Sequence, residues 1–164
     1  MKTTECSEVS QFLESCNIKA AVYHAGMPYS QRAAVQKKWR DGEVHIVCAT
    51  IASGMWIDKI DVRFVIHNTM SRSIESYYQE SGRAGRDNLP AFCVVLYTLY
   101  DYFRMRRLMR YRNRADMERL NSMKHYCELK DGCRRETLLK HLQAISFKCK
   151  NDSQPCDKLL QFQI

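Results

Sequence analysis

Two arginines in a glycine-broken turn constrain this chain more than any other feature. Residues 79–87 read QESGRAGRD, which predicts the end of a short helix followed by a tight loop. Gly82 and Gly85 let the backbone take positive φ and come close to a ligand. Arg83 and Arg86 then project two guanidinium groups from one loop, a geometry suited to bidentate capture of phosphate oxygens. The alternative is a glycine-capped helix end with two solvated arginines.

The sequence around this loop alternates between strand and helix patterns. Four short apolar runs are typical of strands: residues 19–23, 44–49, 62–67 and 92–97. Three helices are expected beside them: residues 4–16, a helix that Ser30 caps and Asp41-Gly42 ends, and a helix that Ser73 caps and that runs to Ser81. Such alternation indicates βαβ units on a parallel sheet, with strands buried on both faces. The predicted fold class is therefore α/β.

Beyond residue 98 the pattern is helical only, and it is basic. Residues 100–150 carry 14 Lys or Arg and 6 Asp or Glu, whereas residues 1–99 carry 11 and 10. The charge excess thus lies in one segment, as expected for a region that contacts a polyanion. The alternatives are a solvated helical surface, or pairing of the arginines with Asp101, Asp116 and Glu118. A first helix has Tyr102, Met105, Leu108 and Met109 near one face, and a second begins after Asn113.

Composition excludes several classes of protein. No apolar run approaches the roughly 18 residues of a membrane span, and the first residues lack the apolar core of a secretory signal. We therefore expect a nuclear protein, or a cytoplasmic one if bacterial, that is neither secreted nor in a membrane. Its eight cysteines are then thiols or metal ligands rather than disulfides. The sequence does not indicate an oligomeric state.

The arginine loop resembles motif VI of superfamily-two helicases. Three further stretches narrow the resemblance to the RecQ family: SIESYY at 73–78, ATIASGMWIDK at 49–59 and YHAGM at 23–27. The similarity runs from about residue 5 to residue 157 and covers only a middle slice of a RecQ helicase. It implies an incomplete C-terminal RecA-like lobe over residues 1–98, with motifs V and VI. A helical, truncated zinc-binding subdomain is expected over residues 99–164.

The resemblance assigns roles in ATP hydrolysis to the loop. Arg86 corresponds to the family's arginine finger, with Arg83 beside it on the phosphates and Gln79 as a positioning residue. In motif V, Gly54 lies at the end of a strand and Asp58 matches the position used near the nucleotide ribose. Here the sequence also departs from the family, because Trp56 replaces a glycine.

Two groups of residues are candidates for DNA contact. The first group matches stretches that the family places on DNA or at a ligand-bearing strand end, and consists of His24, Arg32 and Thr50. The second belongs to the basic helical segment and consists of Arg104, Arg107 and Arg110, within a cluster of six arginines between positions 104 and 114. Such a cluster is expected to bind a phosphate backbone with little sequence preference.

A zinc site is indicated but incomplete. Cys133, Cys149 and Cys156 match three ligands of the RecQ zinc module, whereas Leu159 stands where the family has its fourth cysteine. A closed structural zinc site needs four ligands. Water, Asp157 or His141 are the alternatives for the fourth position, and Cys127 is a competing ligand. The other interpretation is that these cysteines are free buried thiols.

The 164 residues contain neither a P-loop, G-x-x-x-x-G-K-[ST], nor a Walker B motif. ATP and Mg²⁺ are therefore expected only with a partner lobe from a longer chain, and the chain alone is expected to be inactive. The leading hypothesis is part of an ATP-dependent 3′–5′ DNA helicase that acts in unwinding, recombination and repair. A non-catalytic DNA-binding module and a zinc-dependent interaction module are the alternatives.

Overall fold

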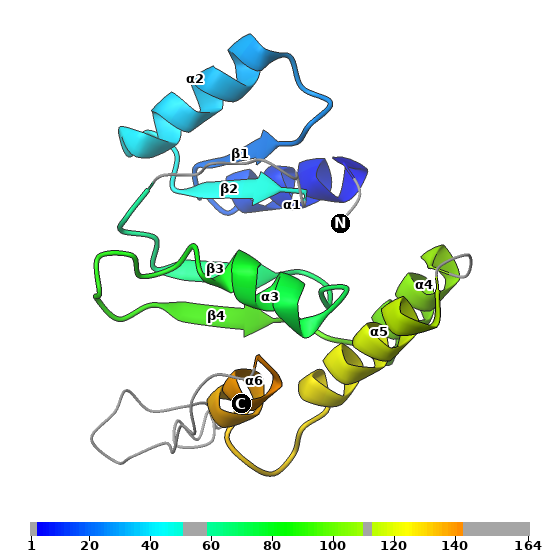
Figure 1. Ribbon diagram of the computed structural model, residues 1–164. Coiled ribbons are helices and arrows are strands. Elements are labelled where there is room, and N and C mark those ends of the chain that lie inside the picture. The colour runs from blue at the N-terminus through cyan, green and yellow to red at the C-terminus, as the bar shows by residue number, and fades with distance from the viewer. Residues whose placement is uncertain (1–2, 51–58, 110–112, 143–164) are drawn as a thin grey trace. The chain divides into compact units, whose positions relative to one another are not determined.

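The computed structural model describes residues 3–50, 59–109 and 113–142 (Figure 1). The chain divides into two compact units, residues 1–59 and 60–164. The first unit contains α1 (Thr3–Ser15), β1 (Ala20–Tyr23), α2 (Tyr29–Arg40) and β2 (Ile46–Ala49). The second contains β3 (Phe64–His67), α3 (Ile74–Ser81), β4 (Phe92–Val95), α4 (Leu99–Leu108), α5 (Arg114–Cys127) and α6 (Arg134–His141). No described helix is long and apolar enough to cross a membrane.

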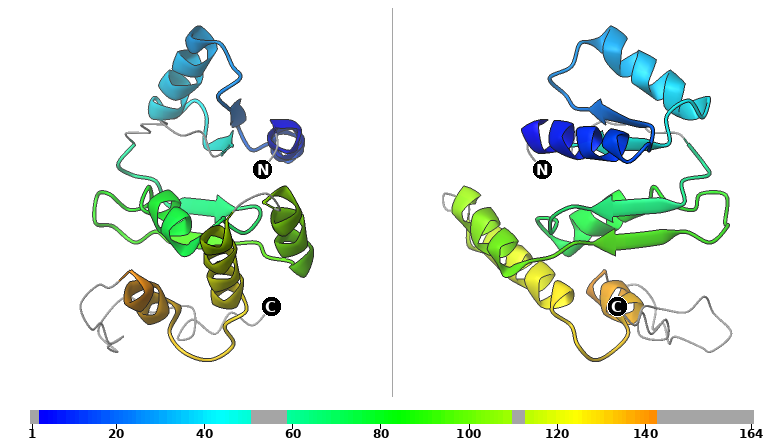
Figure 2. Two further views of the ribbon diagram at one scale, coloured as in Figure 1. Left: turned by 45° about the vertical axis from the view of Figure 1, so that its right-hand side comes forward. Right: turned by 180° about the vertical axis from the view of Figure 1, so that it is seen from behind.

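The first unit is a two-stranded parallel sheet between two helices. β1 pairs with β2 from Ala20 opposite Ile46 to Tyr23 opposite Ala49, and Figure 2 shows α1 and α2 on opposite sides of this sheet. The predicted cap at Ser30 is wrong, because α2 begins one residue earlier, directly after Pro28. The pyrrolidine ring holds φ of Pro28 at −53°, which suits the entry to a helix without a side-chain cap.

The second unit begins with another parallel pair. β3 pairs with β4 from Phe64 opposite Phe92 to His67 opposite Val95, and the two phenylalanine rings stack with centroids 5.6 Å apart. The ring of Tyr77 on α3 lies against His67, so α3 is held to the end of β3. The other face, with Phe64, Ile66, Phe92 and Val94, is exposed. The expectation of strands buried on both faces is therefore wrong for β3 and β4 in the described part of the chain.

The core of the second unit lies where α3, α4 and α5 meet. Its buried members are Met70, Ile74, Tyr77, Met109, Leu120, Met123 and Tyr126. The Tyr97 hydroxyl, just before α4, donates a hydrogen bond to Glu128, just after α5, and the Tyr102 hydroxyl within α4 donates to Asn121 within α5. The start of α4 thus lies beside the end of α5, so the two helices run antiparallel. The expected stripe on α4 is correct for Met109 but wrong for Leu108, whose side chain is exposed.

The structure confirms an α/β fold with parallel strands, followed by a helical region. Among the described strands the pairing forms two separate two-stranded sheets. The boundary between the two compact units follows residue 59 in the sequence, within the range assigned from the sequence to the lobe. The division into a lobe over residues 1–98 and a subdomain over residues 99–164 stays a prediction.

Candidate functional site

The loop that carries the two arginines is tied to the beginning of β3. Arg63 Nη2 donates to both carboxylate oxygens of Asp87, at 2.5 and 2.6 Å, and Arg63 Nη1 donates to the carbonyl of Pro90 at 2.9 Å. The amide of Gly85 donates to the carbonyl of Val62 at 3.0 Å. The Arg63 guanidinium also lowers the pKa of Asp87. Side chain and backbone thus fix the C-terminal half of the loop to one strand.

The backbone of the loop uses its two glycines differently. Gly85 has φ of +63°, and a Cβ atom there would lie 3.1 Å from both Ala91 Cβ and the carbonyl of Leu89. Gly85 therefore uses the positive φ that glycine permits, and any other side chain would be strained at this position. Gly82 caps α3 with φ of −64°, so it does not use the positive φ that glycine permits, because the helical hydrogen bonding of α3 extends to this residue.

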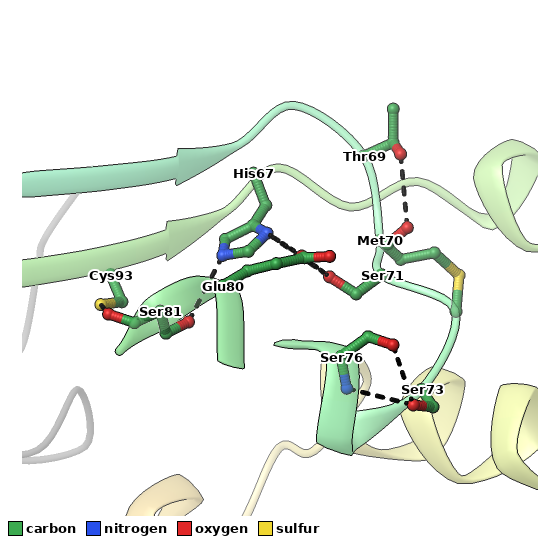
Figure 3. A network of polar contacts seen from close by, with 9 residues as sticks. All are labelled: His67, Thr69, Met70, Ser71, Ser73, Ser76, Glu80, Ser81 and Cys93. Atoms are coloured by element: carbon green, nitrogen blue, oxygen red, sulfur yellow. Dashed lines mark hydrogen bonds and ion pairs between the residues drawn. The ribbon is translucent and has the colours of Figure 1, made fainter. Parts of the chain in front are cut away.

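The start of the loop is tied to the end of β3 (Figure 3). The His67 side chain is only 8% exposed, and its Nδ1 lies 3.1 Å from Glu80 Oε2. Its Nε2 lies 3.3 Å from Ser81 Oγ, while Ser71 Oγ donates to the same Glu80 oxygen at 2.7 Å. Both ring nitrogens of His67 thus contact the last turn of α3. Because Gly82 follows directly, the exit of the chain into the loop is fixed.

Between these two attachments lie the two arginines predicted to act on phosphate, and Gln79, the predicted positioning residue, lies just before the first attachment on α3. Arg86 is exposed and its Nε donates to the carbonyl of Gly82 at 3.4 Å, Arg83 is half-buried, and Gln79 is exposed on α3. The structure therefore brings all three into one short segment. Chemically, the segment can present two cationic, multi-donor groups to an anion.

Sequence analysis did not find the residues that hold this loop. Arg63 and His67 bracket the apolar core of β3, and neither belongs to the loop itself. The available signal was an arginine and a histidine at the two ends of an otherwise apolar strand. Their partners were not visible from the sequence. Asp87 comes close to Arg63, and Glu80 comes close to His67, only when α3 folds back along β3.

In the first unit, the candidate residues collect at one edge of the sheet. His24 follows β1 and Thr50 follows β2, and the amide of Thr50 donates to the carbonyl of Tyr23 at 3.3 Å. The carboxyl ends of parallel strands are where α/β folds place ligands. Arg32 lies in the first turn of α2. Among the described residues, His24 Nδ1 and Arg32 Nε are buried atoms without a hydrogen-bond partner. Gly54 and Asp58 lie outside the described residues.

The basic helices keep part of their charge exposed. Arg107 is exposed and Arg104 is half-buried, while Arg110 lies outside the described residues. Of the proposed acidic partners, Glu118 pairs with Arg114 at 2.9 Å and Asp116 with Arg119 at 3.3 Å. Asp101 instead bonds the backbone and side chain of Thr98 in a capping box. The alternative that the arginines pair with these three carboxylates is therefore correct for Arg114, which pairs with Glu118.

Cys133 is the one predicted zinc ligand in the described part of the chain, and Cys149 and Cys156 lie outside it. Cys133 is the N-cap of α6, and its Sγ accepts from the amide of Glu136 at 3.4 Å. Backbone amides at a helix N-terminus stabilise a thiolate, so this environment fits a zinc ligand. Burial raises the pKa of Cys127 to about 11, which disfavours the thiolate that zinc requires.

His141 does not share a metal with Cys133 in this structure. The two residues lie at opposite ends of the eight-residue α6, which separates them by roughly 12 Å at 1.5 Å per residue. His141 Nε2 instead lies 2.9 Å from Glu75 Oε1. No group of three or more His, Cys, Asp or Glu arranged for a metal occurs within residues 3–50, 59–109 and 113–142.

Comparison with known proteins identifies both halves of the chain. Residues 1–88 match the helicase conserved C-terminal domain, and residues 99–158 match the RecQ zinc-binding region. By fold, the chain is similar to the yeast DEAD-box splicing factor Prp28, with a TM-score of 0.55 at 19% identity over 74% of this chain and 30% of that one. The C-terminal domain of yeast Dbp5 gives a TM-score of 0.53 at 15% identity, over 67% and 65% of the two chains.

The relatives by sequence are RecQ-like helicases. The chain is 43% identical to the RecQ-like DNA helicase blm-1 of Caenorhabditis elegans, over 93% of this chain and 16% of that protein. It is 41% identical to the RecQ-like DNA helicase BLM of Xenopus laevis, over 95% and 12%. The chain thus spans less than a fifth of the length of these two relatives. Nearly all of it aligns, and the chain therefore belongs to the RecQ family of helicases.

Proposed function

We propose that the chain supplies the arginine-bearing lobe of an ATP-dependent 3′–5′ DNA helicase of RecQ type. The observation that carries this proposal is the loop at residues 82–87, fixed to both ends of β3 by Arg63 and His67. A group that stabilises a transition state must be held in place before the reaction, because reorganising it would raise the barrier. The two attachments supply that rigidity.

Within this proposal, Arg86 stabilises the charge on the transferring phosphoryl group and Arg83 contacts the neighbouring phosphates. Gln79 positions the nucleotide from the last turns of α3. Gly54 and Asp58 contribute from motif V. ATP and Mg²⁺ are held by a lobe with a P-loop and a Walker B motif, which the 164 residues do not contain. The chain alone neither hydrolyses ATP nor unwinds DNA.

The test uses the chain alone and the chain joined to a P-loop lobe. The chain alone should show no DNA-stimulated ATP turnover. In the joined protein, Arg86→Ala should reduce kcat on the order of a thousandfold with little change in KM for ATP, because the finger acts on charge that develops in the transition state. Arg72→Ala is the matched control, since Arg72 is exposed in the same unit. Turnover by the chain alone, or equal losses in binding and kcat, would contradict the proposal.

A second candidate function, DNA binding without catalysis, is favoured by the exposed arginines of α4. Residues 100–150 carry the net positive charge of the chain, and Arg106 and Arg107 are exposed. Non-specific affinity is expected at roughly 10⁻⁴ to 10⁻⁶ M, falling steeply with salt. Replacing Arg106 and Arg107 with alanine should make the slope of log K against log salt shallower. An unchanged slope would place the DNA surface elsewhere.

That other surface is the sheet edge of the first unit. In this part of the proposal, His24, Arg32 and Thr50 contact the phosphate backbone of DNA, because they gather where parallel strands of α/β folds place ligands. Arg32→Ala tests it by the same salt titration. DNA as the partner and a nuclear location are the expectations of the proposal.

Zinc is the proposed metal, held by Cys133, Cys149 and Cys156. The fit rests on the helix N-terminus at Cys133 and on the match of residues 99–158 to the RecQ zinc-binding region. Zinc bound there would connect Cys133, at the start of α6, with Cys149 and Cys156. A zinc-dependent interaction module is the corresponding third function, tested by the metal content and by the loss of a partner complex after chelation.

A further inference from the structure

The outer face of α4 exposes large aromatic side chains. Tyr100 is 72% exposed and Phe103 is 53% exposed. The opposite face of the helix packs on α5 through Tyr102, Met105 and Met109. Core packing therefore accounts for one face of α4, and the rings on the other face need a separate explanation.

These rings share their face with two arginines. Tyr100, Phe103 and Arg107 follow one another at i, i+3 and i+7, and Arg106 lies three residues beyond Phe103. Residues three and four apart are neighbours on a helix surface. Phe103 is thus flanked by Tyr100 on one side and by both guanidinium groups on the other. Arg106 and Arg107 lie in the last turn of α4, where positive charge interacts favourably with the helix dipole. The dipole does not explain the exposed rings.

The central ring is held in position although it is exposed. Phe103 packs edge-on against Tyr102, with centroids 5.4 Å apart and an interplanar angle of 65°. Tyr102 is itself fixed, because its hydroxyl donates to Asn121 Oδ1 at 2.9 Å on α5 and Lys124 Nζ lies 5.6 Å from its ring centroid. A pre-positioned ring loses little freedom on binding.

We propose that this outer face of α4 binds unpaired nucleotides, with bases stacked on Tyr100 and Phe103 and phosphates held by Arg106 and Arg107. Every base has a π-face, so stacking on aromatic rings is tolerant of sequence. Charge complementarity selects a polyanion over an apolar protein surface. A single strand offers free base faces, whereas the bases of a duplex are stacked on one another and present only their edges in the grooves. The inference rests on the proposed DNA binding and adds to it a selectivity for single strands.

The experiment separates base stacking from charge. Fluorescence anisotropy measures binding of the full chain to three labelled probes at one salt concentration: oligothymidylate, an abasic strand with the same number of phosphates, and a duplex of the same length. The chain should bind oligothymidylate more tightly than the abasic strand. The double variant Tyr100→Ala/Phe103→Ala should weaken binding to oligothymidylate by about fivefold or more, and leave the abasic strand unchanged.

Three further variants complete the comparison. Tyr100→Phe keeps the ring and should retain the preference for bases. Phe12→Ala removes a comparably exposed ring from α1 and should change nothing. Arg106→Ala/Arg107→Ala should weaken binding to all three probes.

Three outcomes overturn the inference. If the aromatic variants bind oligothymidylate as the wild type does, while the arginine variants weaken all probes, stacking is wrong and the charge-based proposal stands. If the wild type binds none of the probes, both proposals fail. An equal loss on the abasic strand in the aromatic double variant would show a structural role for the rings, and would also overturn stacking.

Discussion

Arg63 and Asp87, 24 residues apart in the sequence, form an ion pair with an N···O distance of 2.5 Å. One residue lies just before β3 and the other ends the arginine loop. The pair therefore fixes the segment that presents Arg83 and Arg86. His67 does the same at the other end of the strand. The rigidity of the candidate site is thus a property of β3 more than of the loop.

Removing Arg63 should loosen the loop. In Arg63→Ala, Asp87 loses its cationic partner and Pro90 its donor, so the amide of Gly85 should exchange its hydrogen faster than in the wild type. Hydrogen exchange followed by mass spectrometry or NMR measures this. Arg72→Ala, an exposed arginine of the same unit, is the control. Unchanged exchange at Gly85 would show that the backbone alone holds the loop.

The two loop glycines should tolerate alanine differently. Gly85→Ala places a Cβ at positive φ and 3.1 Å from two atoms, so it should destabilise the chain by about 2 kcal/mol. Gly82 has a helical φ, which alanine adopts without strain. Gly82→Ala should therefore change the free energy of unfolding by less than about 0.5 kcal/mol. Urea unfolding compares them. Equal effects would contradict the difference in φ between Gly82 and Gly85.

The two leucines of the helical region offer a similar contrast. Leu120 is fully buried in the core, whereas Leu108 is 66% exposed. Leu120→Ala should cost about 2–5 kcal/mol, since it leaves a cavity. Leu108→Ala should change the free energy of unfolding by less than about 0.5 kcal/mol. A large cost for Leu108 in urea unfolding would restore the expectation that it belongs to the core stripe.

Zinc content should depend on Cys133 and not on Cys127. Cys133→Ala removes a ligand from the N-terminus of α6 and should lower the zinc bound per chain. Cys127→Ala should leave it unchanged, because burial keeps that thiol protonated with a pKa of about 11. Elemental analysis after dialysis against a chelator measures both. An equal loss of bound zinc in the two variants would show that Cys127 is also a ligand.

Glu75 should give the link between α3 and α6 a dependence on pH. Its pKa is lowered to about 2, first by a hydrogen bond from Ser73, then by its own backbone amide and by His141. A carboxyl group with a lowered pKa stabilises the fold above its ordinary value and loses that contribution as the pH falls toward the folded value.

Glu75→Gln should therefore lower the urea midpoint near neutral pH, and the difference from the wild type should shrink between about pH 4.5 and pH 2. Glu8→Gln, an exposed glutamate on α1, controls for the loss of a charge. A difference that stays constant through this range would show that ionisation of Glu75 does not stabilise the fold.

Much of the fold was predictable from local pattern. The four strands, the cap at Ser73 and the helix that follows Asn113 were expected from the sequence, and Ser73 Oγ and Asn113 Oδ1 do accept the capping bonds. These features depend on residues within one turn of each other. The start of α2 was misplaced because Ser30 has a capping side chain, whereas the proline before it already sets the entry angle.

The sequence by itself determined the family and the residues of the arginine loop, because a run of glycines and arginines at fixed spacing needs no distant partner to be recognised. Only the tertiary structure decided what holds that loop. Arg63 reaches Asp87, and His67 reaches Glu80 and Ser81, because β3 and α3 fold back along each other. Which face of α4 is buried was decided in the same way, by its antiparallel packing on α5. A single helix carries apolar residues on both faces here, and contact with a neighbour alone selects the one that enters the core.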